Sequence, residues 1–264
     1  DASGNVYLAG GTNSTTNITS GGFQNTYGGL GDAFLVKFNA TTGARLWSTY
    51  YGGTEIEEAD LNGLATDASG NVYLGGEASS ASTGIASGGF QNATGGSTDA
   101  FLVKFNASGA LLWATYYGDT GFDAGYGIAT DGSNNVYLAG NTRSTINIAS
   151  GGHQNTYGGV PQDAFLVKFN AGGTRLWATY YGGTDNEEGL GVVTDASGDV
   201  YLSGDAYSAS GIASGGFQNS LIGTEDIFVA RFNAAGVLNC ATYYGQTHDE
   251  IGLVAIDNLS GSIY

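Results

Sequence analysis

One short pattern occurs four times in this chain of 264 residues. Its copies begin at Asp1, Asp67, Asp131 and Asp195 and read DASGNVY, DASGNVY, DGSNNVY and DASGDVY. A fifth, less regular copy covers residues 257–264, so successive copies are separated by 66, 64, 64 and 62 residues. Self-similarity at such a period is typical of a solenoid, a propeller or an array. The repeat therefore limits the fold more strongly than any single motif does.

Each unit contains four short segments with the composition of β-strands. In the best-defined unit they are residues 63–66, 71–75, 99–105 and 111–117. These segments are rich in aromatic and β-branched residues and are bounded by Gly, Asn, Asp and Ser. No stretch of about twelve or more residues shows a helical period in its apolar positions. The chain is therefore expected to be all-β.

Tight turns join the first strand to the second and the third strand to the fourth. In the DASGN turn, the Asp side chain can accept backbone N–H groups, and Gly or Asn can adopt a positive φ. Residues 106–109, Asn-Ala-Ser-Gly, have the same chemistry. Four antiparallel strands joined by short hairpins form one blade of a propeller. We therefore predict a β-propeller built of four-stranded antiparallel blades about 64 residues long, with four complete units.

Residues 1–264 are expected to form a single propeller segment. Its units start near residues 1, 67, 131 and 195, and a partial fifth unit starts at residue 257. Because residues 257–264 duplicate residues 1–7, a closed ring would not need both copies. This duplication and the absence of Met favour a segment of a longer array, so further repeats of the same chain are expected. The total number of blades stays open, with an open superhelix or a filament as alternatives.

The repeated residues also resemble a known family. The run from residue 99 to residue 140, with DAFLVKF, WATYYG and GIATDGSNNVYLAG in order, resembles the SBBP repeat, a β-propeller repeat of bacterial surface and secreted proteins. Residues 87–92, SGGFQN, resemble the spacer of that family. The resemblance recurs in every unit and covers nearly the whole chain. It implies a propeller in the extracellular space or on the bacterial cell surface, and it supplies no catalytic residues.

The net charge and the lengths of the apolar runs limit the kinds of molecule that this chain is expected to bind. Seven Lys and Arg residues against 24 Asp and Glu residues give a net charge of −17. Such a chain should repel nucleic acid and anionic membranes and attract cations or cationic partners. No apolar run approaches the roughly 18 residues that span a bilayer. We therefore expect no nucleic-acid partner and no membrane insertion.

Strand direction assigns the connections to two faces of the propeller. The turns after the first and third strands lie on one face, which we call the tight-turn face. The connections after the second and fourth strands, such as residues 10–31 and 140–162, lie on the other, the long-loop face. Binding residues are concentrated on loops in scaffolds of this kind, so a protein or carbohydrate ligand is expected on the long-loop face. Tyr27 and Tyr157 could stack on sugars there, or pin the long loops to their blades.

Acidic residues gather just before the first strand of each blade, which is the innermost strand of a propeller. Eleven of the 24 acids lie in these connections: Glu55, Glu57, Glu58, Asp60, Asp119, Asp123, Asp185, Glu187, Glu188, Asp249 and Glu250. They are expected to ring the mouth of the central channel, where clustered oxygen ligands would suit Ca²⁺. The candidate ligands recur at matching positions: Asp123, Glu187, Glu188, Asp249 and Glu250. The alternative is that these acids are solvated and keep the protein soluble, and no Asp-x-Asp-x-Asp-Gly loop decides between the two.

Two substitutions interrupt the repeat. His153 stands where the other units have a Phe in the SGGFQN motif, and it is expected to anchor its loop as Phe does. Cys240 stands at the position of Trp47, Trp113 and Trp177, and is expected to be a packing residue. No Cys-His pairing or Gly-x-Ser-x-Gly motif points to a nucleophile.

Two classes of function fit these observations. An enzyme built on repeats must break its symmetry to assemble one catalytic constellation, and here the departures are few and scattered. The uniformity favours a non-enzymatic extracellular module of a large secreted or cell-surface bacterial protein, acting in adhesion or as a binding scaffold. The alternative is a hydrolase or lyase acting on polysaccharide, which would need two convergent carboxylates on the long-loop face.

Overall fold

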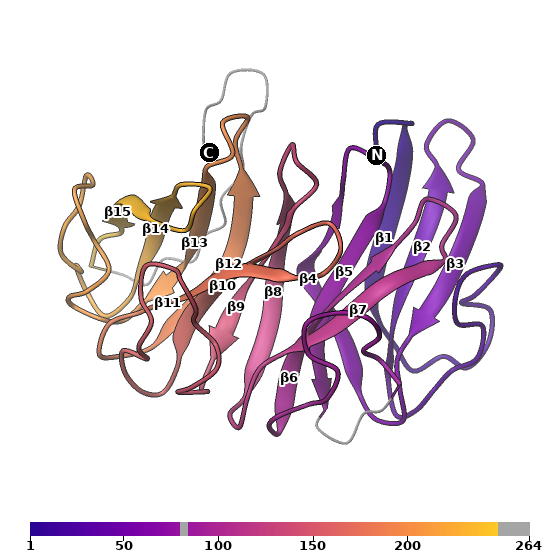
Figure 1. The fold of residues 1–264 in the computed structure, drawn as a ribbon, viewed down its shortest axis with the longest axis horizontal. Helices are drawn as coiled ribbons and strands as arrows, with labels where there is room; N and C mark the ends of the chain where they lie inside the picture. Colours follow the sequence, from indigo (N-terminus) through magenta and orange to yellow (C-terminus); the bar gives the residue numbers. More distant parts are fainter. Residues whose placement is uncertain (80–83, 248–264) are drawn as a thin grey trace.

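The computed structural model describes residues 1–79 and 84–247, and these residues form strands and connections without any helix (Figure 1). No apolar helix that could cross a membrane occurs among them. The strands are β1 (Asn5–Thr12), β2 (Asp32–Asn39), β3 (Arg45–Tyr51), β4 (Glu57–Thr66), β5 (Val72–Ser79), β6 (Thr98–Phe105), β7 (Leu111–Tyr117), β8 (Asp123–Thr130), β9 (Val136–Thr142), β10 (Asp163–Phe169), β11 (Arg175–Tyr181), β12 (Glu187–Thr194), β13 (Val200–Ala206), β14 (Asp226–Phe232) and β15 (Leu238–Tyr244).

The strands form four antiparallel blades. Blades 2, 3 and 4 have four strands each, as the repeat predicts, whereas the described part of blade 1 has three. Blade 1 is β1–β3, blade 2 is β4–β7, blade 3 is β8–β11 and blade 4 is β12–β15. The inner strands of blades 2 and 3 touch through one parallel bridge between Asn62 and Gly127. The sequence unit and the blade are out of phase by one strand, because the unit that starts at Asp67 begins at the turn between β4 and β5. Each inner strand therefore comes from the preceding sequence unit.

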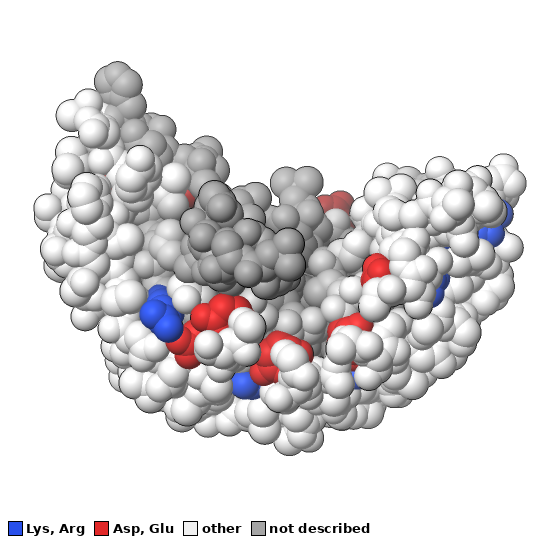
Figure 2. Space-filling view, turned by 90° about the horizontal axis from the view of Figure 1, so that it is seen from above, with Lys and Arg blue, Asp and Glu red and all other residues white. Residues whose placement is uncertain are grey.

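The blades follow one another around an open crescent, with blade 1 and blade 4 at its two ends (Figures 1 and 2). Within the described residues no strand of blade 1 pairs with a strand of blade 4. The partial fifth unit lies outside the described residues, so the number of blades in the full assembly stays open.

The apolar core is divided into layers between neighbouring blades. The same pair of rings recurs at each junction, with centroids 5.5, 5.2 and 5.0 Å apart. The pairs are Tyr51 with Phe101, Tyr117 with Phe165, and Tyr181 with Phe228. Strands β9, β10 and β13 are buried along their whole length, and β9 and β10 of blade 3 have a neighbouring blade on each face. Aromatic side chains suit this position, since they fill the space between two twisted sheets and stack at an angle.

A Trp and a Lys side chain fasten each blade to the next. The indole Nε1 of Trp113 donates a hydrogen bond of 3.0 Å to the backbone oxygen of Ala171, and Lys104 Nζ donates to the same oxygen at 3.2 Å. Ala171 lies in the tight turn of the following blade. The arrangement recurs with Trp47 and Lys37 on Ala107, and with Trp177 and Lys168 on Ala234. We call this contact the Trp–Lys latch.

The glycine of each tight turn makes the latch possible. Gly173 has a φ of +85°, and a Cβ built on it would lie 2.9 Å from Cδ2 of Trp113. Gly109 and Gly236 meet Trp47 and Trp177 in the same way. Any side chain at these positions would strain the backbone and push the indole away from its carbonyl acceptor.

The Asp of each DASGN turn binds both its own turn and the lysine of the latch. In blade 2, Asp67 Oδ1 accepts the backbone N–H groups of Ser69 and Asn71, at 3.0 and 2.9 Å. Its Oδ2 accepts the hydroxyl of Tyr73 and lies 3.2 Å from Lys104 Nζ. Burial alone would raise the pKa of Asp67, but the hydrogen bonds from Asn71 and the charge of Lys104 outweigh it and hold the pKa below its usual value. The Asp therefore caps its turn and orients the latch lysine.

These paired charges lie on the tight-turn face. Figure 2 looks onto this face, and acidic and basic side chains lie next to one another along the arc.

Blade 4 has the repeat position of the latch but not its side chains. Cys240 pairs in register with Arg231, as Trp177 pairs with Lys168, which confirms the alignment of Cys240 with the tryptophans. Arg231 turns back within its own blade and forms an ion pair of 2.6 Å with Asp199. The regular latch is therefore replaced at this blade.

The long loops do not stand free of the blades. The SGGFQN motif runs along the outermost strand, where Ser20 pairs with Ser48 and Gln24 pairs with Tyr50. Gly22 must be glycine, because a Cβ there would lie 2.5 Å from the backbone oxygen of Ser48. The motif recurs in all four blades, and it covers the exposed edge that an outer strand would otherwise present.

Truncation of a latch tryptophan should destabilise the protein far more than truncation of the cysteine at the same position. Trp113 is 4% exposed and fills the gap between blades 2 and 3, so Trp113→Ala should lower the free energy of unfolding by roughly 3–5 kcal/mol. Cys240→Ala should cost much less, because Cys240 is smaller and only partly buried. Urea unfolding followed by tyrosine and tryptophan fluorescence measures both. Equal losses for the two variants would contradict the latch.

Candidate functional site

Two acidic side chains meet at each junction between blades. One is the Asp that opens the third strand of a blade, and the other is the acid that opens the inner strand of the next blade. The pairs are Asp32 with Glu57, Asp99 with Asp123, and Asp163 with Glu187. All six side chains are fully buried. We call each of these a carboxylate pair.

The glycine of the Tyr-Tyr-Gly motif lies between the two acids of each pair. A Cβ built on Gly118 would lie 2.5 Å from Asp99 Oδ1 and 2.7 Å from Asp123 Oδ2. Gly52 and Gly182 lie between the other two pairs in the same way. The two carboxylates therefore face each other across one Cα atom, and a larger residue would not fit between them.

The first acid of each pair holds the glycine-rich end of its own long loop. Asp32 Oδ2 accepts the backbone N–H of Gly28 at 2.9 Å and the side-chain amide of Gln24 at 3.1 Å. Asp99 Oδ2 accepts the N–H of Gly95. These bonds satisfy only one oxygen, since Asp32 Oδ1 and Asp99 Oδ1 are buried without a hydrogen-bond donor.

The second acid of each pair is held by the connection that enters its strand. Glu57 Oε2 accepts the N–H of Gly53 at 2.6 Å. Asp123 accepts the N–H of Asp119 at 2.9 Å and the hydroxyls of Ser144 and Thr142. These donors hold the acid at the start of the strand, facing the carboxylate of the preceding blade.

The third pair differs in its donors. Glu187 accepts the N–H groups of Gly183 and Ser208, at 2.8 and 2.9 Å. Asp163 accepts Gly158 at 2.7 Å on Oδ2 and Gly159 at 3.3 Å on Oδ1. All four oxygens of this pair therefore have a donor.

Burial raises the pKa values of these acids. It raises the pKa of Asp99 to about 6 and that of Asp163 to about 6, and the charge of Asp123 adds to the effect on Asp99. It raises the pKa of Glu187 to about 7, with a further contribution from Asp163. In residues 1–79 and 84–247, the salt bridges to Lys and Arg all involve acids of the tight-turn face. None of these salt bridges involves Asp99, Asp123, Asp163 or Glu187.

The structure places the predicted cation ligands in different surroundings. Asp123 and Glu187 belong to carboxylate pairs. Glu188 is half-buried, lies opposite Asp205 across the strands and accepts the side-chain amide of Gln162 at 2.8 Å. Asp249 and Glu250 lie outside the described residues. In the described part of the chain no group of three or more His, Cys, Asp and Glu side chains is arranged to hold a metal ion, so the predicted calcium site stays a prediction.

One expectation about these acids was wrong. They were expected in loops around the mouth of the channel, but Glu57, Asp123 and Glu187 are the first residues of inner strands and are buried. The inner strand of blade 2 begins at Glu57, six residues before the predicted start at residue 63. Sequence reasoning also missed Asp32, Asp99 and Asp163, although the recurrence of Asp at the start of the DAF motif was a usable signal.

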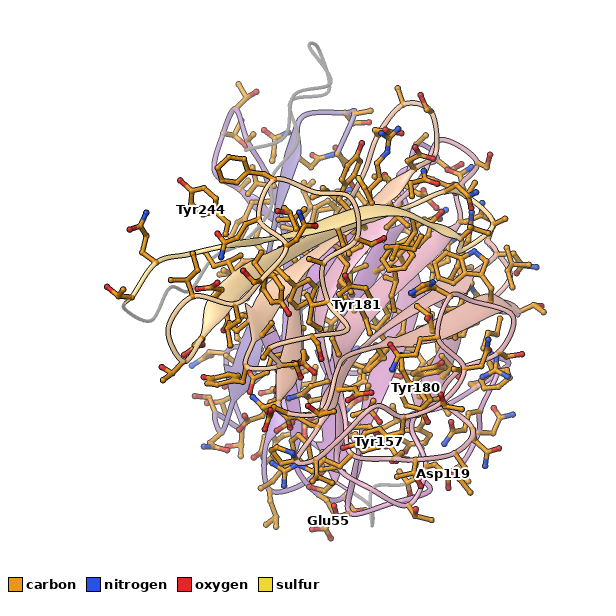
Figure 3. The ribbon with its side chains drawn as sticks, turned by 90° about the vertical axis from the view of Figure 1, so that its left-hand side faces the viewer. Glu55, Asp119, Tyr157, Tyr180, Tyr181 and Tyr244 are labelled. Atoms are coloured by element: carbon orange, nitrogen blue, oxygen red, sulfur yellow. The ribbon has the colours of Figure 1, made fainter. Side chains whose placement is uncertain are left out.

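The aromatic residues of the long loops serve as anchors. Tyr27 packs edge-on against Tyr50 and Tyr157 against Tyr180, each with ring centroids 5.8 Å apart. Figure 3 shows Tyr157 next to Tyr180 on the same side of the ribbon as Asp119. His153 packs against Phe232 of the next blade, as Phe23 packs against Phe105. The anchoring role expected for His153 is consistent with this contact.

The chain carries an SBBP-type repeat. The family model described as a beta-propeller repeat matches residues 112–146, which cover β8, β9 and nearly all of β7. Trp113 and Asp123 lie within the matched residues, and the latch and the carboxylate pair to which they belong recur at the neighbouring junctions. A search of curated proteins found no match.

The carboxylate pairs should make the protein less stable as the pH rises. With raised pKa values, folded Asp163 and Glu187 retain protons that the unfolded chain loses near its ordinary values of about 4. In chelator, the free energy of unfolding should therefore fall as pH increases from about 4 to 7. Asp163→Asn should flatten this decline, whereas Asp185→Asn, at an exposed site, should not. Urea unfolding at several pH values measures the slope, and equal slopes in both variants would contradict the assignment.

Proposed function

We propose that this SBBP-type propeller segment is a non-enzymatic extracellular module of a large secreted or cell-surface bacterial protein, and that it binds other molecules through its long-loop face. The observation that carries the proposal is a set of exposed apolar side chains at the loop tips of this face. Leu30 and Val160 are 67% and 73% exposed, and both stand shortly before a third strand. These two side chains stand in the loops of blades 1 and 3, where a partner that spans the face can contact both.

The backbone beneath these tips is held in place before any ligand arrives. Leu30 donates its N–H to the backbone oxygen of Glu55, and Gly28 donates to the buried Asp32. A surface that is already ordered loses little entropy on binding. The loops are therefore suited to present side chains to a partner.

The charge around the tips favours a partner with basic groups. Glu55 lies beside Leu30 through the same backbone contact, and Glu58 is exposed on the neighbouring strand. Acidic groups around apolar side chains would attract a protein surface of opposite charge and disfavour nucleic acid. A carbohydrate is the second candidate ligand, but Tyr27 and Tyr157 already use part of their ring surface against the blades.

The burial of the carboxylate pairs supports a non-enzymatic role. A glycoside hydrolase needs two carboxylates that flank its substrate in an accessible cleft. Here Asp99 and Asp123 converge, but neither is exposed, and an equivalent pair occurs at every described junction. The repetition indicates a structural part of the blade joint. The polysaccharide hydrolase or lyase remains the alternative function.

The proposal is tested by binding of the intact protein to a sugar array and by pull-down from an extracellular extract. Replacement of Leu30 and Val160 by Asn should reduce binding at least tenfold. Leu112→Asn is the matched control, because Leu112 is 50% exposed but lies beside a tight turn on the other face. Loss of binding in the control alone, or turnover of a polysaccharide by the protein, would overturn the proposal.

A further inference from the structure

Each carboxylate pair places two acidic side chains next to each other inside the protein. Asp99 and Asp123 are both 0% exposed, and a Cβ on Gly118 would touch an oxygen of each. Two like charges so close in a region of low dielectric repel strongly, and burying even one ionised carboxylate is costly unless something pairs with it. A proton or a bound cation must therefore stabilise the pair in the folded protein.

Two of the pairs have an oxygen that is ready to accept a ligand. Asp99 Oδ1 has no hydrogen-bond donor, and it is the oxygen that points across Gly118 toward Asp123. Asp32 Oδ1 has the same orientation across Gly52, toward Glu57. Asp226, the equivalent residue of blade 4, also has an Oδ1 without a donor. Buried polar atoms are nearly always partnered in folded proteins, so this repeated exception, aimed at a second carboxylate in Asp32 and Asp99, points to a missing ligand.

The first pair borders a cleft at the surface. A cleft of about 290 Å³ adjoins Glu57 and is lined in addition by Asn13, Thr12 and Glu58. These side chains supply further amide, hydroxyl and carboxylate oxygens. Calcium is bound by about six to eight oxygen ligands in a flexible geometry, whereas magnesium needs a compact octahedron and keeps its water.

We propose that the carboxylate pairs Asp32–Glu57 and Asp99–Asp123 are Ca²⁺ sites that join consecutive blades. Each site takes its two carboxylates from different blades, so the ion links the blades as well as neutralising the charge. The pair Asp163–Glu187 has a donor on each of its four oxygens and is excluded from the proposal. This inference goes beyond the proposed binding function, since it concerns the cohesion of the array.

Calcium titration of the whole chain at pH 7.5 tests the proposal, with thermal unfolding and equilibrium dialysis as readouts. The melting temperature of the unmodified protein should rise by several degrees in millimolar Ca²⁺ and fall in chelator, because the ion binds only the folded state. Magnesium should have a smaller effect.

Two variants locate the sites. Asp99→Asn should bind one Ca²⁺ fewer per chain and should respond less to calcium, yet be at least as stable as the unmodified protein in chelator, because the repulsion is gone. Asp32→Asn should behave in the same way and serves as the second variant if Asp99→Asn fails to fold. Asp163→Asn and Asp185→Asn should retain the full number of bound ions.

A melting temperature that does not change with calcium would overturn the proposal, and the pairs would then be held by protons alone. Retention of every bound ion in both Asp99→Asn and Asp32→Asn would also overturn it. Neither result affects the proposed binding function, which is measured with ligands on the long-loop face.

Discussion

The architecture depends on one backbone carbonyl per blade. The oxygen of Ala171 receives both the indole N–H of Trp113 and the ammonium group of Lys104, and the adjacent Gly173 lies flat against the indole ring. The Trp and the Lys come from one blade, and the carbonyl oxygen and the glycine come from the tight turn of the next blade. The contact therefore sets both the distance and the angle between the two blades. Because the Trp is buried and its N–H is satisfied, the contact combines apolar burial with a directional bond. The regular crescent follows from repeating this contact at intervals of about 64 residues.

Blade 4 differs from the other blades because it lacks the Trp and Lys side chains of the latch. Arg231 is drawn to Asp199, a residue that replaces the Asn found at this position in the other units, and Cys240 is too small to reach a neighbouring turn. The paired substitutions change the latch from a contact between blades into an ion pair within one blade. In the described residues, therefore, the side of blade 4 that faces away from blade 3 is built differently from the three regular junctions.

Sequence reasoning succeeded where a property repeats within one unit. The strand at Leu111–Tyr117 was predicted with its observed bounds, and the alignment of Cys240 with the tryptophans is confirmed by strand register. It failed where a feature is assembled from two units. Asp99 and Asp123 lie 24 residues apart and belong to different blades, so no local pattern reveals that they meet. The early start of the inner strand was missed for a related reason, because an acidic residue resembles a loop residue until a neighbouring blade buries it.

The buried acidic side chains have different partners at the two ends of the blades. On the tight-turn face, Asp67 and Asp131 each have a lysine partner, and the pKa values of both are held below their usual range. At the opposite end of the same blades, no salt bridge within the described residues joins Asp99 or Glu187 to a basic residue, and burial raises the pKa of both. The chain has only seven Lys and Arg residues, and four of them form the salt bridges of the tight-turn face. Arg143 is a basic residue of the long-loop end, where it donates to Gln162. The negative charge that remains at this end is left to protons, to cations in solution or to a basic partner.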